Sequence, residues 1–312
     1  MRYASWSRRM QMLNGVLNIY KKKGFTSHDV VAKMRGILRQ KKIGHTGTLD
    51  PDAEGVLPVC LGQATRLCDM LTDHSKSYRA VMLLGVETDT QDATGQVLAE
   101  KEVLCTEEQV RQAVLSFVGP YDQIPPMYSA LKVDGKRLYD LARQGKVVER
   151  KARPVMIHDI AIESVELPRV TMTVHCSKGT YIRTLCHDIG QMLGCGACME
   201  SLLRTQVERF VLEDSITLEQ LEQIRDAGEL EKYLISVEEM FSGLLEAQAK
   251  TEADGLVHNG NPVKLFMVEL ERPAVSGSQY RMYDSSHEFL GIYEYEEERK
   301  WLKPQKMFLG GN

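Results

Sequence analysis

The N-terminal part of the chain shows continuous apolar runs typical of strands and, between them, apolar residues at helical spacing. Val16, Leu17 and Ile19 form a short run that predicts a strand, and residues 56–61 form a longer run, interrupted only by Pro58, that predicts a buried segment. Between them, apolar residues recur at helical spacing after Thr26 and Ser27, either of which can cap a helix. The apolar face of this helix comprises Val30, Val31, Met34, Ile37 and Leu38. The N-terminal part therefore predicts a strand and a one-sided helix packed on a common core.

The middle of the chain alternates between the two periods. Residues 76–85 predict a strand, and the alternating stretches 156–166 and 169–177 predict a pair of strands. Helical spacing covers 107–118, where Gly119 and Pro120 end it, and begins again near residue 182. In that second helix we expect Ile182, Leu185, Ile189, Met192 and Leu193 to point inward, which places Arg183 in the first turn.

The C-terminal third changes character. Apolar positions over 215–246 predict further helices that complete the large domain, and residues 248–254 predict a linker. The remaining residues carry short apolar runs between glycines and prolines. This pattern predicts a small β-rich module.

Composition places the chain among ordinary globular proteins. Its 312 residues, 43% of them hydrophobic, supply enough core for one large domain and a smaller one. No apolar run of about 18 residues occurs, and the first residues lack the apolar core of a signal peptide, so we expect a cytoplasmic protein without a membrane segment. Seven scattered cysteines predict reduced thiols, and Cys195 and Cys198 have no second pair with which to form a zinc site.

The net charge of −4 hides an uneven distribution. Residues 1–42 contain one acid, Asp29, whereas acids gather late in the chain, as in 294–298. A charge run is most often a solvated face, but a basic segment on a soluble protein is also what a nucleic-acid surface requires. The basic residues are Arg2, Arg8, Arg9, Lys21, Lys22, Lys23, Lys33, Arg35, Arg39, Lys41 and Lys42.

The candidate chemistry centres on residues 44–59, which read GHTGTLDPDAEGVLPV. Glycines at 44, 47 and 55 permit close backbone approach or positive φ, and Pro51 restricts Asp50 to an extended conformation. Spacing alone leaves two interpretations open, a presented acid at the edge of a core or a simple turn. A second polar loop, residues 88–95, contains acids that we expect to shape turns rather than perform chemistry.

This run, followed by Leu61-Gly62-Gln63-Ala64-Thr65-Arg66, resembles the signature of the TruB family, the tRNA pseudouridine-55 synthases. Residues 76–80 and the segment Ser177-Lys178-Gly179-Thr180-Tyr181-Ile182-Arg183 resemble two further family motifs. The sequence departs from the family pattern at Lys22, where the family has proline, and at Leu203, where it commonly has arginine. The resemblance covers the chain from about Met12 and is weakest in the C-terminal module.

The resemblance implies an α+β fold, in which a pseudouridine synthase-like catalytic domain with a central mixed sheet carries a small C-terminal β-rich, PUA-like RNA-binding module. We place the catalytic domain at 12–247 and the module at 248–312, after a disordered leader at 1–11. An insertion at about 121–153 resembles the family's RNA-clamping segment, although a plain amphipathic hairpin has the same pattern.

The resemblance also implies roles for individual residues. Asp50 would be the nucleophile, Arg183 would hold Asp50 by charge-assisted hydrogen bonds and lower its pKa, and Tyr78 would stack on the base. Attack on the ribose, attack on the uracil ring and deprotonation of the sugar all remain open for Asp50. His45 would fill the space of the flipped base, its alternative being a loop-structuring histidine. The remaining candidates for RNA binding are Tyr181, Lys21, Leu202, Lys132, Lys136 and Arg137.

The implied reaction breaks a C–N bond and forms a C–C bond to the same uracil, so it needs no cofactor, and no metal site is expected. The expected partner is the T-stem-loop of tRNA, and we expect a monomer without an obligate protein partner or membrane. Two alternatives remain: a catalysis-independent tRNA-folding chaperone, and a guide-RNA-dependent synthase subunit.

Overall fold

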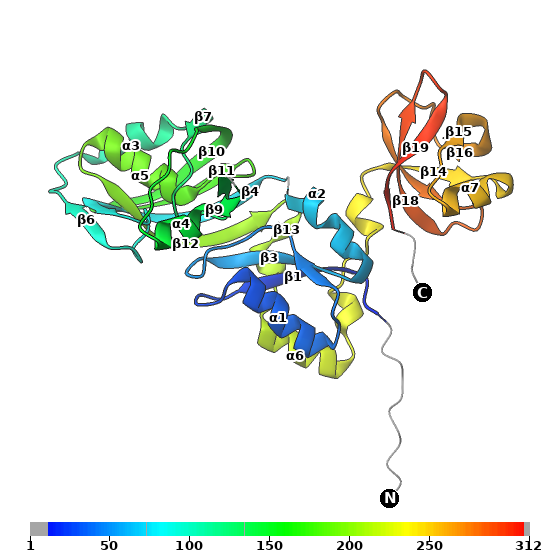
Figure 1. Cartoon of the computed structure of the whole chain (residues 1–312), viewed down its shortest axis with the longest axis horizontal. Coiled ribbons are helices and arrows are strands. Elements are labelled where there is room, and N and C mark those ends of the chain that lie inside the picture. The colour runs from blue at the N-terminus through cyan, green and yellow to red at the C-terminus, as the bar shows by residue number, and fades with distance from the viewer. Residues whose placement is uncertain (1–11, 73, 134, 309–312) are drawn as a thin grey trace, which may run out of the picture.

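The computed structural model describes residues 12–72, 74–133 and 135–308, and the side chain of Lys132 is outside that description. The expected leader at 1–11 therefore lies outside the described residues. Two sheets organise the rest, one of nine strands and one of six. Figure 1 shows the second sheet as a separate unit at the C-terminal end of the chain.

The nine-stranded sheet has the order β1-β3-β12-β4-β11-β10-β7, with β2 beside β3 and β13 beside β12. The pairing of β12 with β3 is parallel and the other ladders are antiparallel, so the sheet is mixed as expected. Its strands are β1 (Gly15–Lys21), β2 (Ile43–His45), β3 (Glu54–Leu61), β4 (Lys76–Leu84), β7 (Gly119–Gln123), β10 (Arg153–Glu166), β11 (Arg169–Cys176), β12 (Ala197–Val207) and β13 (Phe210–Val211).

Two pairs of helices cover the two halves of this sheet (Figure 1). The helices α1 (Ser27–Leu38) and α6 (Leu218–Ala227) pack on β1 and β3, while α3 (Glu107–Leu115) and α5 (Ile182–Leu193) pack on β4, β10, β11 and β12. Thr26 caps α1 in a reciprocal capping box with Asp29, and the predicted face of α1 is buried. One prediction for α5 was wrong, because Met192 is 58% exposed at the last turn.

The six-stranded sheet forms the C-terminal module in the order β15-β19-β18-β17-β14-β16. Its strands are β14 (Leu245–Ala249), β15 (Val263–Lys264), β16 (Val268–Leu270), β17 (Gln279–Tyr283), β18 (Phe289–Glu296) and β19 (Trp301–Met307), with the helix α7 (Asp254–His258) beside them. The linker expected at 248–254 is therefore wrong, since Ala247 and Ala249 are buried in the module's own core. The five residues of β14, LEAQA, do alternate, but the two buried side chains are alanines, so the apolar signal is weak.

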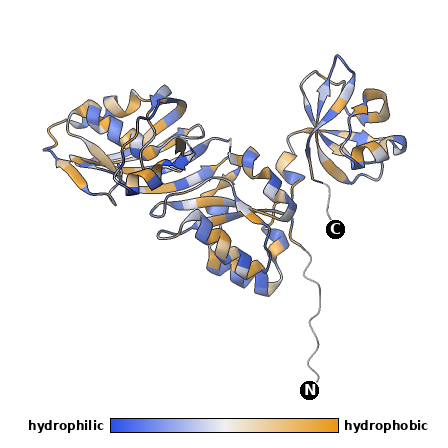
Figure 2. Cartoon of the chain, viewed as in Figure 1, coloured by the Kyte–Doolittle hydropathy of each residue, from blue (hydrophilic) through white to orange (hydrophobic). Residues whose placement is uncertain are grey.

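The module also contacts the large domain. Ile292 and Phe308 share an apolar cluster with Val16, Val56 and Leu67, and Arg66 Nη1 donates to the Met307 carbonyl at 2.8 Å. Figure 2 shows hydrophobic and hydrophilic residues interleaved along the helices and strands of both units.

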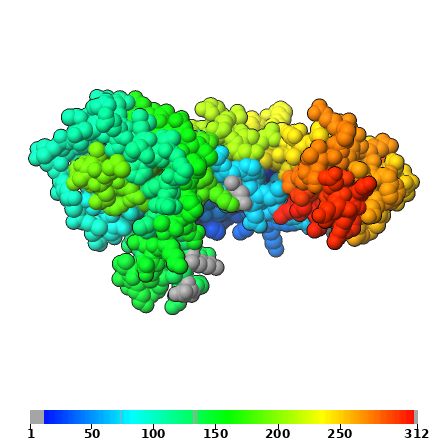
Figure 3. All heavy atoms as spheres, turned by 90° about the horizontal axis from the view of Figure 1, so that it is seen from above, coloured from blue at the N-terminus to red at the C-terminus, as the bar shows by residue number. Residues whose placement is uncertain are grey.

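Residues 124–152 leave the sheet between β7 and β10 and form an arm. It contains β8 (Lys132–Val133), β9 (Lys136–Arg137) and α4 (Leu138–Arg143). A second excursion, with β5 (Val86–Thr88) and β6 (Val97–Glu100), carries the polar loop 88–95, and α2 (Cys68–Thr72) precedes β4. Figure 3 shows the arm projecting from the body of the large domain.

Candidate active site

The Asp50 loop connects β2 to β3, which lies between β1 and β12 in the large sheet. Gly47 and Gly55 have φ of 120° and 106°, as the loop's spacing predicted, and a Cβ on Gly55 would lie 2.2 Å from the Arg204 carbonyl oxygen. The backbone N–H of Leu49 donates to Ser27 Oγ at 2.9 Å, which ties the loop to the start of α1. The loop thus packs too closely against β12 and α1 to be a solvated turn.

Lys21 fastens the loop from the end of β1. Its side chain is fully buried, and Nζ donates to the carbonyls of Pro51 at 3.0 Å and Ala53 at 2.6 Å. Burial lowers the pKa of Lys21 to about 8, against the opposing effect of Asp50. A buried ammonium occupied in this way does not reach RNA, so the structure corrects the RNA-binding role expected of Lys21: it braces the loop.

Arg183 and Asp50 meet at the first turn of α5. Arg183 Nε lies 3.2 Å from Asp50 Oδ2, which is the contact that the sequence predicted. The two side chains differ in exposure, at 6% for Arg183 and 42% for Asp50. The arginine is therefore part of the core, whereas the carboxylate remains open to a bound molecule.

Asp92 is a second partner of Arg183 that sequence reasoning missed. Arg183 Nη1 lies 3.2 Å from Asp92 Oδ2, while Asp92 Oδ1 accepts hydrogen bonds from Thr90 Oγ1 at 2.8 Å and from the backbone of Thr94 at 3.0 Å. Asp92 does shape its turn, as expected, and it also anchors the arginine. Only its spacing from Thr90 and Thr94 was visible in the sequence, and that spacing is common to ordinary turns.

The electrostatic balance at Asp50 differs from the expectation. Burial raises the pKa of the Asp50 carboxyl, Arg183 opposes that rise, and the negative charge of Asp92 adds to it. The expected lowering by Arg183 is therefore wrong as a net effect, because the partial burial of the carboxyl and the negative charge of Asp92 together outweigh the attraction of Arg183.

Tyr78 and Leu202 lie on the inner face of the sheet beside the loop. Tyr78 on β4 is 8% exposed and Leu202 on β12 is 9% exposed, and both share a cluster with Leu49. Arg204 stands opposite Tyr78 across the β12–β4 ladder, and its positive charge opposes the effect of burial on the Tyr78 pKa. Burial raises the pKa of Tyr78, so this side chain is a neutral phenol at pH 7.

Tyr181 stands at the N-terminal end of α5, where the buried Gln123 holds its backbone. Gln123 Nε2 donates to the Tyr181 carbonyl at 3.0 Å, and the Tyr181 N–H donates to Gln123 Oε1 at 2.7 Å. Arg183 Nη2 donates to the Tyr128 carbonyl at 2.9 Å. Two hydrogen-bonded links therefore join the base of the arm to the start of α5, next to Asp50.

His45 ends β2 just before the loop. Its ring contacts that of His28 edge to face, with centroids 5.2 Å apart, and burial together with His28 lowers the pKa of His45. The ring is therefore neutral at pH 7 and suited to stacking. His28 is exposed on α1, and no motif in the sequence links it to this site.

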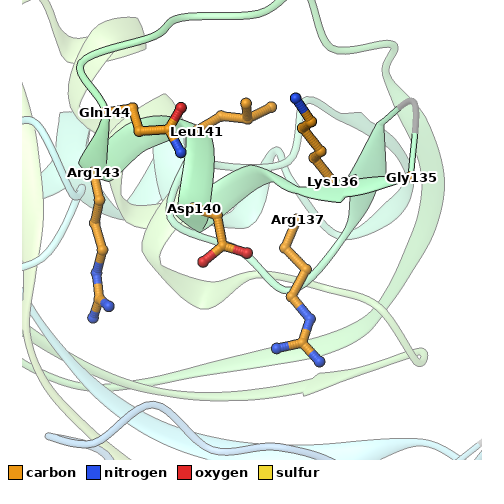
Figure 4. A pocket seen from close by; sticks show the side chains of 7 residues that line it. All are labelled: Gly135, Lys136, Arg137, Asp140, Leu141, Arg143 and Gln144. Carbon is orange, nitrogen blue, oxygen red and sulfur yellow. The ribbon is translucent and has the colours of Figure 1, made fainter.

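Lys136 and Arg137 lie on the arm, both exposed, and the side chain of Lys132 lies outside the described residues. Lys136 and Arg137 line a hollow of about 660 Å³ around α4 (Figure 4). The side chains of Arg137 and Arg143 extend to the same side of α4, with Asp140 between them, and Lys136 extends to the other side. Both arginines lie over the Tyr139 ring, at 5.8 and 5.5 Å from its centroid.

Within the described ranges, no group of His, Cys, Asp and Glu side chains is arranged to hold a metal ion. No helix in the described part of the chain is long and apolar enough to cross a membrane. All seven cysteines are free.

Comparison with known proteins agrees with this geometry. The family model for the N-terminal domain of TruB family pseudouridylate synthases matches residues 35–182, and that for the tRNA pseudouridylate synthase B C-terminal domain matches residues 183–242. The chain is 52% identical to tRNA pseudouridine synthase B of Lachnoclostridium phytofermentans, covering 95% of this chain and 100% of the relative. It is 45% identical to the Clostridium novyi protein of that name, with the same coverage.

Solved structures show the same fold. A Cbf5-Nop10-Gar1 complex contains a chain with a TM-score of 0.72 and 28% identity, covering 95% of this chain and 85% of that one. An H/ACA RNP bound to a substrate RNA containing 2'-deoxyuridine gives a TM-score of 0.71 at 26% identity, with the same coverage. Both family models meet between Ile182 and Arg183, within the first turn of α5. This chain belongs to the TruB family of pseudouridine synthases.

Proposed function

We propose that this chain converts the T-loop uridine of tRNA to pseudouridine, with Asp50 as the nucleophile. The observation that carries the assignment is the contrast at the ion pair. Arg183 is 6% exposed and fixed by Asp92 and two backbone carbonyls, while the Asp50 carboxylate that it orients is 42% exposed. An ionised carboxylate that is oriented by a buried arginine and remains accessible to solvent is suited to attack on a bound nucleotide.

The surrounding residues fit the demands of the isomerisation. The uracil must stay in the site after its glycosidic bond breaks, and the apolar wall of Tyr78, Leu202 and Leu49 offers a surface for it. Tyr181, half-buried next to Arg183, would line the other side. A uridine within a folded loop must first leave its stack at a cost of a few kcal/mol, and the neutral ring of His45 would occupy the vacated place.

The arm would grip the RNA backbone. Lys136, Arg137 and Arg143 project into solvent on an element that is hydrogen-bonded to Arg183 through the Tyr128 carbonyl. Phosphate contacts by such side chains give affinity without sequence information. The residues positioned by the nine-stranded sheet would then carry out the reaction, and the arm would bind the RNA backbone.

Asp50→Asn tests the assignment, with Asp52→Asn as the matched control in the same loop. Asparagine keeps the size of the side chain but removes its charge and nucleophilicity. Asp92 still pairs with Arg183, so no buried cation is left alone and the variant should fold. Asp52 is exposed and lies 4.0 Å from Lys23, so its loss should leave turnover unchanged.

We expect no pseudouridine in tRNA incubated with stoichiometric Asp50→Asn, while tRNA affinity stays within about tenfold, or about 1.4 kcal/mol. Thermal unfolding of both variants confirms that each is folded. Turnover by Asp50→Asn near the native rate would overturn the assignment. A variant that refolds tRNA without modifying it would show that a chaperone activity exists beside the chemistry.

We also propose that the chain acts without a protein partner. Relatives that match it over nearly their whole length are named for the synthase activity alone, whereas the solved neighbours lie in complexes. Incubating this chain alone with a tRNA transcript decides the question. Pseudouridine formation without added protein or guide RNA supports independence, and formation only after their addition would refute it.

A further inference from the structure

Arg204 on β12 is the largest fully buried side chain in the described part of the protein and is 1% exposed. Within those residues, no carboxylate lies at ion-pair distance from its guanidinium. Burying a charge without a counter-ion is expensive, and apolar residues of similar volume often replace buried ionic groups without loss of stability. Packing alone therefore does not explain an arginine at this position.

The hydrogen bonds of Arg204 converge on the Asp50 loop. Nε donates to the Val56 carbonyl at 2.7 Å and Nη2 donates to the Gly47 carbonyl at 3.4 Å. These two carbonyls flank the segment 48–55, so one planar guanidinium holds both ends of the loop. Lys21 Nζ donates to the carbonyls of Pro51 and Ala53 within the same segment.

The same guanidinium faces the Tyr78 phenol. Arg204 and Tyr78 are register partners on β12 and β4, which lie side by side in the sheet (Figure 1), and the positive charge of the guanidinium acts directly on the phenol. The arginine thereby joins the wall that would receive the uracil to the loop that would attack the nucleotide. Lysine at this position has the charge but lacks the planar fork needed to serve the Val56 and Gly47 carbonyls together while facing Tyr78.

We propose that Arg204 is a positioning residue for the isomerisation, which fixes the distance and orientation between the Tyr78 ring and the Asp50 carboxylate. The inference rests on the proposed role of Asp50 and goes beyond it, because Arg204 is buried behind the Asp50 loop and Tyr78 and is only 1% exposed. Its effect should therefore appear in the rate of the bound complex and not in tRNA affinity.

The test compares Arg204→Lys, which keeps the charge, with Arg204→Met, which fills much of the space without it. Arg79→Gln is the matched control, since Arg79 lies next to Tyr78 on β4 but is exposed and pairs with Glu163 on the other face. Each variant is measured for thermal unfolding, tRNA affinity and the single-turnover rate at saturating enzyme. Tyr78→Phe is made alone and combined with Arg204→Lys.

Because misplacing a reacting group by about 1 Å can cost about 10²-fold in rate, we expect a loss of that order in the saturating rate of folded Arg204→Lys, with unchanged affinity. Arg204→Met should be no faster than Arg204→Lys, and Arg79→Gln should match the native chain. Tyr78→Phe keeps the ring but removes the phenol oxygen that Arg204 faces, so it should also be slow. Combining it with Arg204→Lys should cost less than the product of the two single effects.

A native saturating rate in folded Arg204→Lys, or single effects that multiply fully in the double variant, would overturn the inference. If Arg204→Lys does not fold, Tyr78→Phe decides alone, because a native rate without the phenol oxygen removes the link that Arg204 makes. Failure of the Asp50 assignment would instead appear as an active Asp50→Asn variant, so the two failures are distinguishable.

Discussion

Replacing Asp92 by asparagine tests the electrostatic coupling at the candidate site. Asp92 Oδ1 accepts from Thr90 and Thr94 and Oδ2 faces Arg183 Nη1 at 3.2 Å. An asparagine that keeps the Oδ1 contacts must direct its amide NH₂ at the guanidinium, which puts a donor against a donor. The reverse orientation gives up the Thr94 contact. Either way Arg183 retains Asp50 as its one carboxylate partner at 3.2 Å.

The size of the effect follows from the bond that is lost. At 3.2 Å and an effective dielectric constant of about 20, the gross attraction between Arg183 and Asp92 is about 5 kcal/mol. Most of that is offset by desolvation, and a hydrogen bond to a charged group contributes about 1.5–3 kcal/mol net. If that loss appears in the placement of Arg183, the rate falls about 10- to 100-fold.

The change also predicts a shift in pH dependence, with a definite sign. The negative charge of Asp92 helps to raise the pKa of Asp50, so its removal lowers that pKa. Asp50 must be ionised to act as a nucleophile, and kcat/KM reports the ionisation of the free enzyme. The acid limb of the kcat/KM profile should therefore move to lower pH in Asp92→Asn, although the plateau is lower.

The assay is pseudouridine formation in a tRNA transcript, measured as kcat/KM from acidic to neutral pH. Asp89→Asn is the control, because Asp89 is exposed in the same loop and accepts from the Gln96 backbone rather than from Arg183. An acid limb that stays in place or moves to higher pH in Asp92→Asn would refute the coupling. A plateau equal to that of the native chain would refute the positioning of Arg183 by Asp92.

Three further predictions concern the rest of the chain. Burial lowers the pKa of Lys21 to about 8, below the ordinary value of about 10.4, so the unfolded state binds more protons than the native state between these two pH values. The free energy of unfolding of the native chain should therefore rise with pH in this range, relative to that of Lys21→Met. Free energies from urea unfolding that change in parallel with pH in the two proteins would contradict this. Changing Lys132, Lys136 and Arg137 to alanine should weaken tRNA binding at unchanged thermal stability and reduce the slope of log K against log salt by roughly 0.7–0.9 for each phosphate contact removed. An unchanged slope would show that these residues form a solvated surface that does not contact RNA. Deleting residues 1–11 should leave folding and activity intact, because the family resemblance starts after them and they show no periodic pattern, and loss of soluble protein would reject this.

Local patterns predicted most of the elements because they are set by nearby residues. The capping box at Thr26 and Asp29 and the apolar face of α1 depend on spacings of three and four, which the sequence displays directly. β14 shows the converse. Its five residues alternate, but its buried side chains are two small alanines, and β16 and β17 pair with its two edges.

The sequence predicted the ion pair at the centre of the candidate site but not the residues that hold it in place. Asp50 and Arg183 stand in distinctive runs, and their contact could be inferred from chemistry. Asp92 and Arg204 reach the same place from separate elements, and nothing local distinguishes an acid in a turn from one that holds a catalytic arginine. Lys21 was noticed, but its charge suggested RNA, because burial is a property of the assembled sheet rather than of the segment.

The two departures from the family pattern find their explanation in the same geometry. Leu203 stands between Leu202 and Arg204 on β12, so its side chain lies on the opposite face of the strand, across from the exposed Arg79 rather than Tyr78. Lys22 is exposed after β1, and its Nζ pairs with Glu219 of α6 at 2.9 Å, while its carbonyl accepts from Lys21 at 3.2 Å. A proline there would keep that carbonyl, and with it the bond to Lys21. Neither departure therefore removes a group that touches Asp50, because the loop is held by Lys21 and Arg204, and both are present.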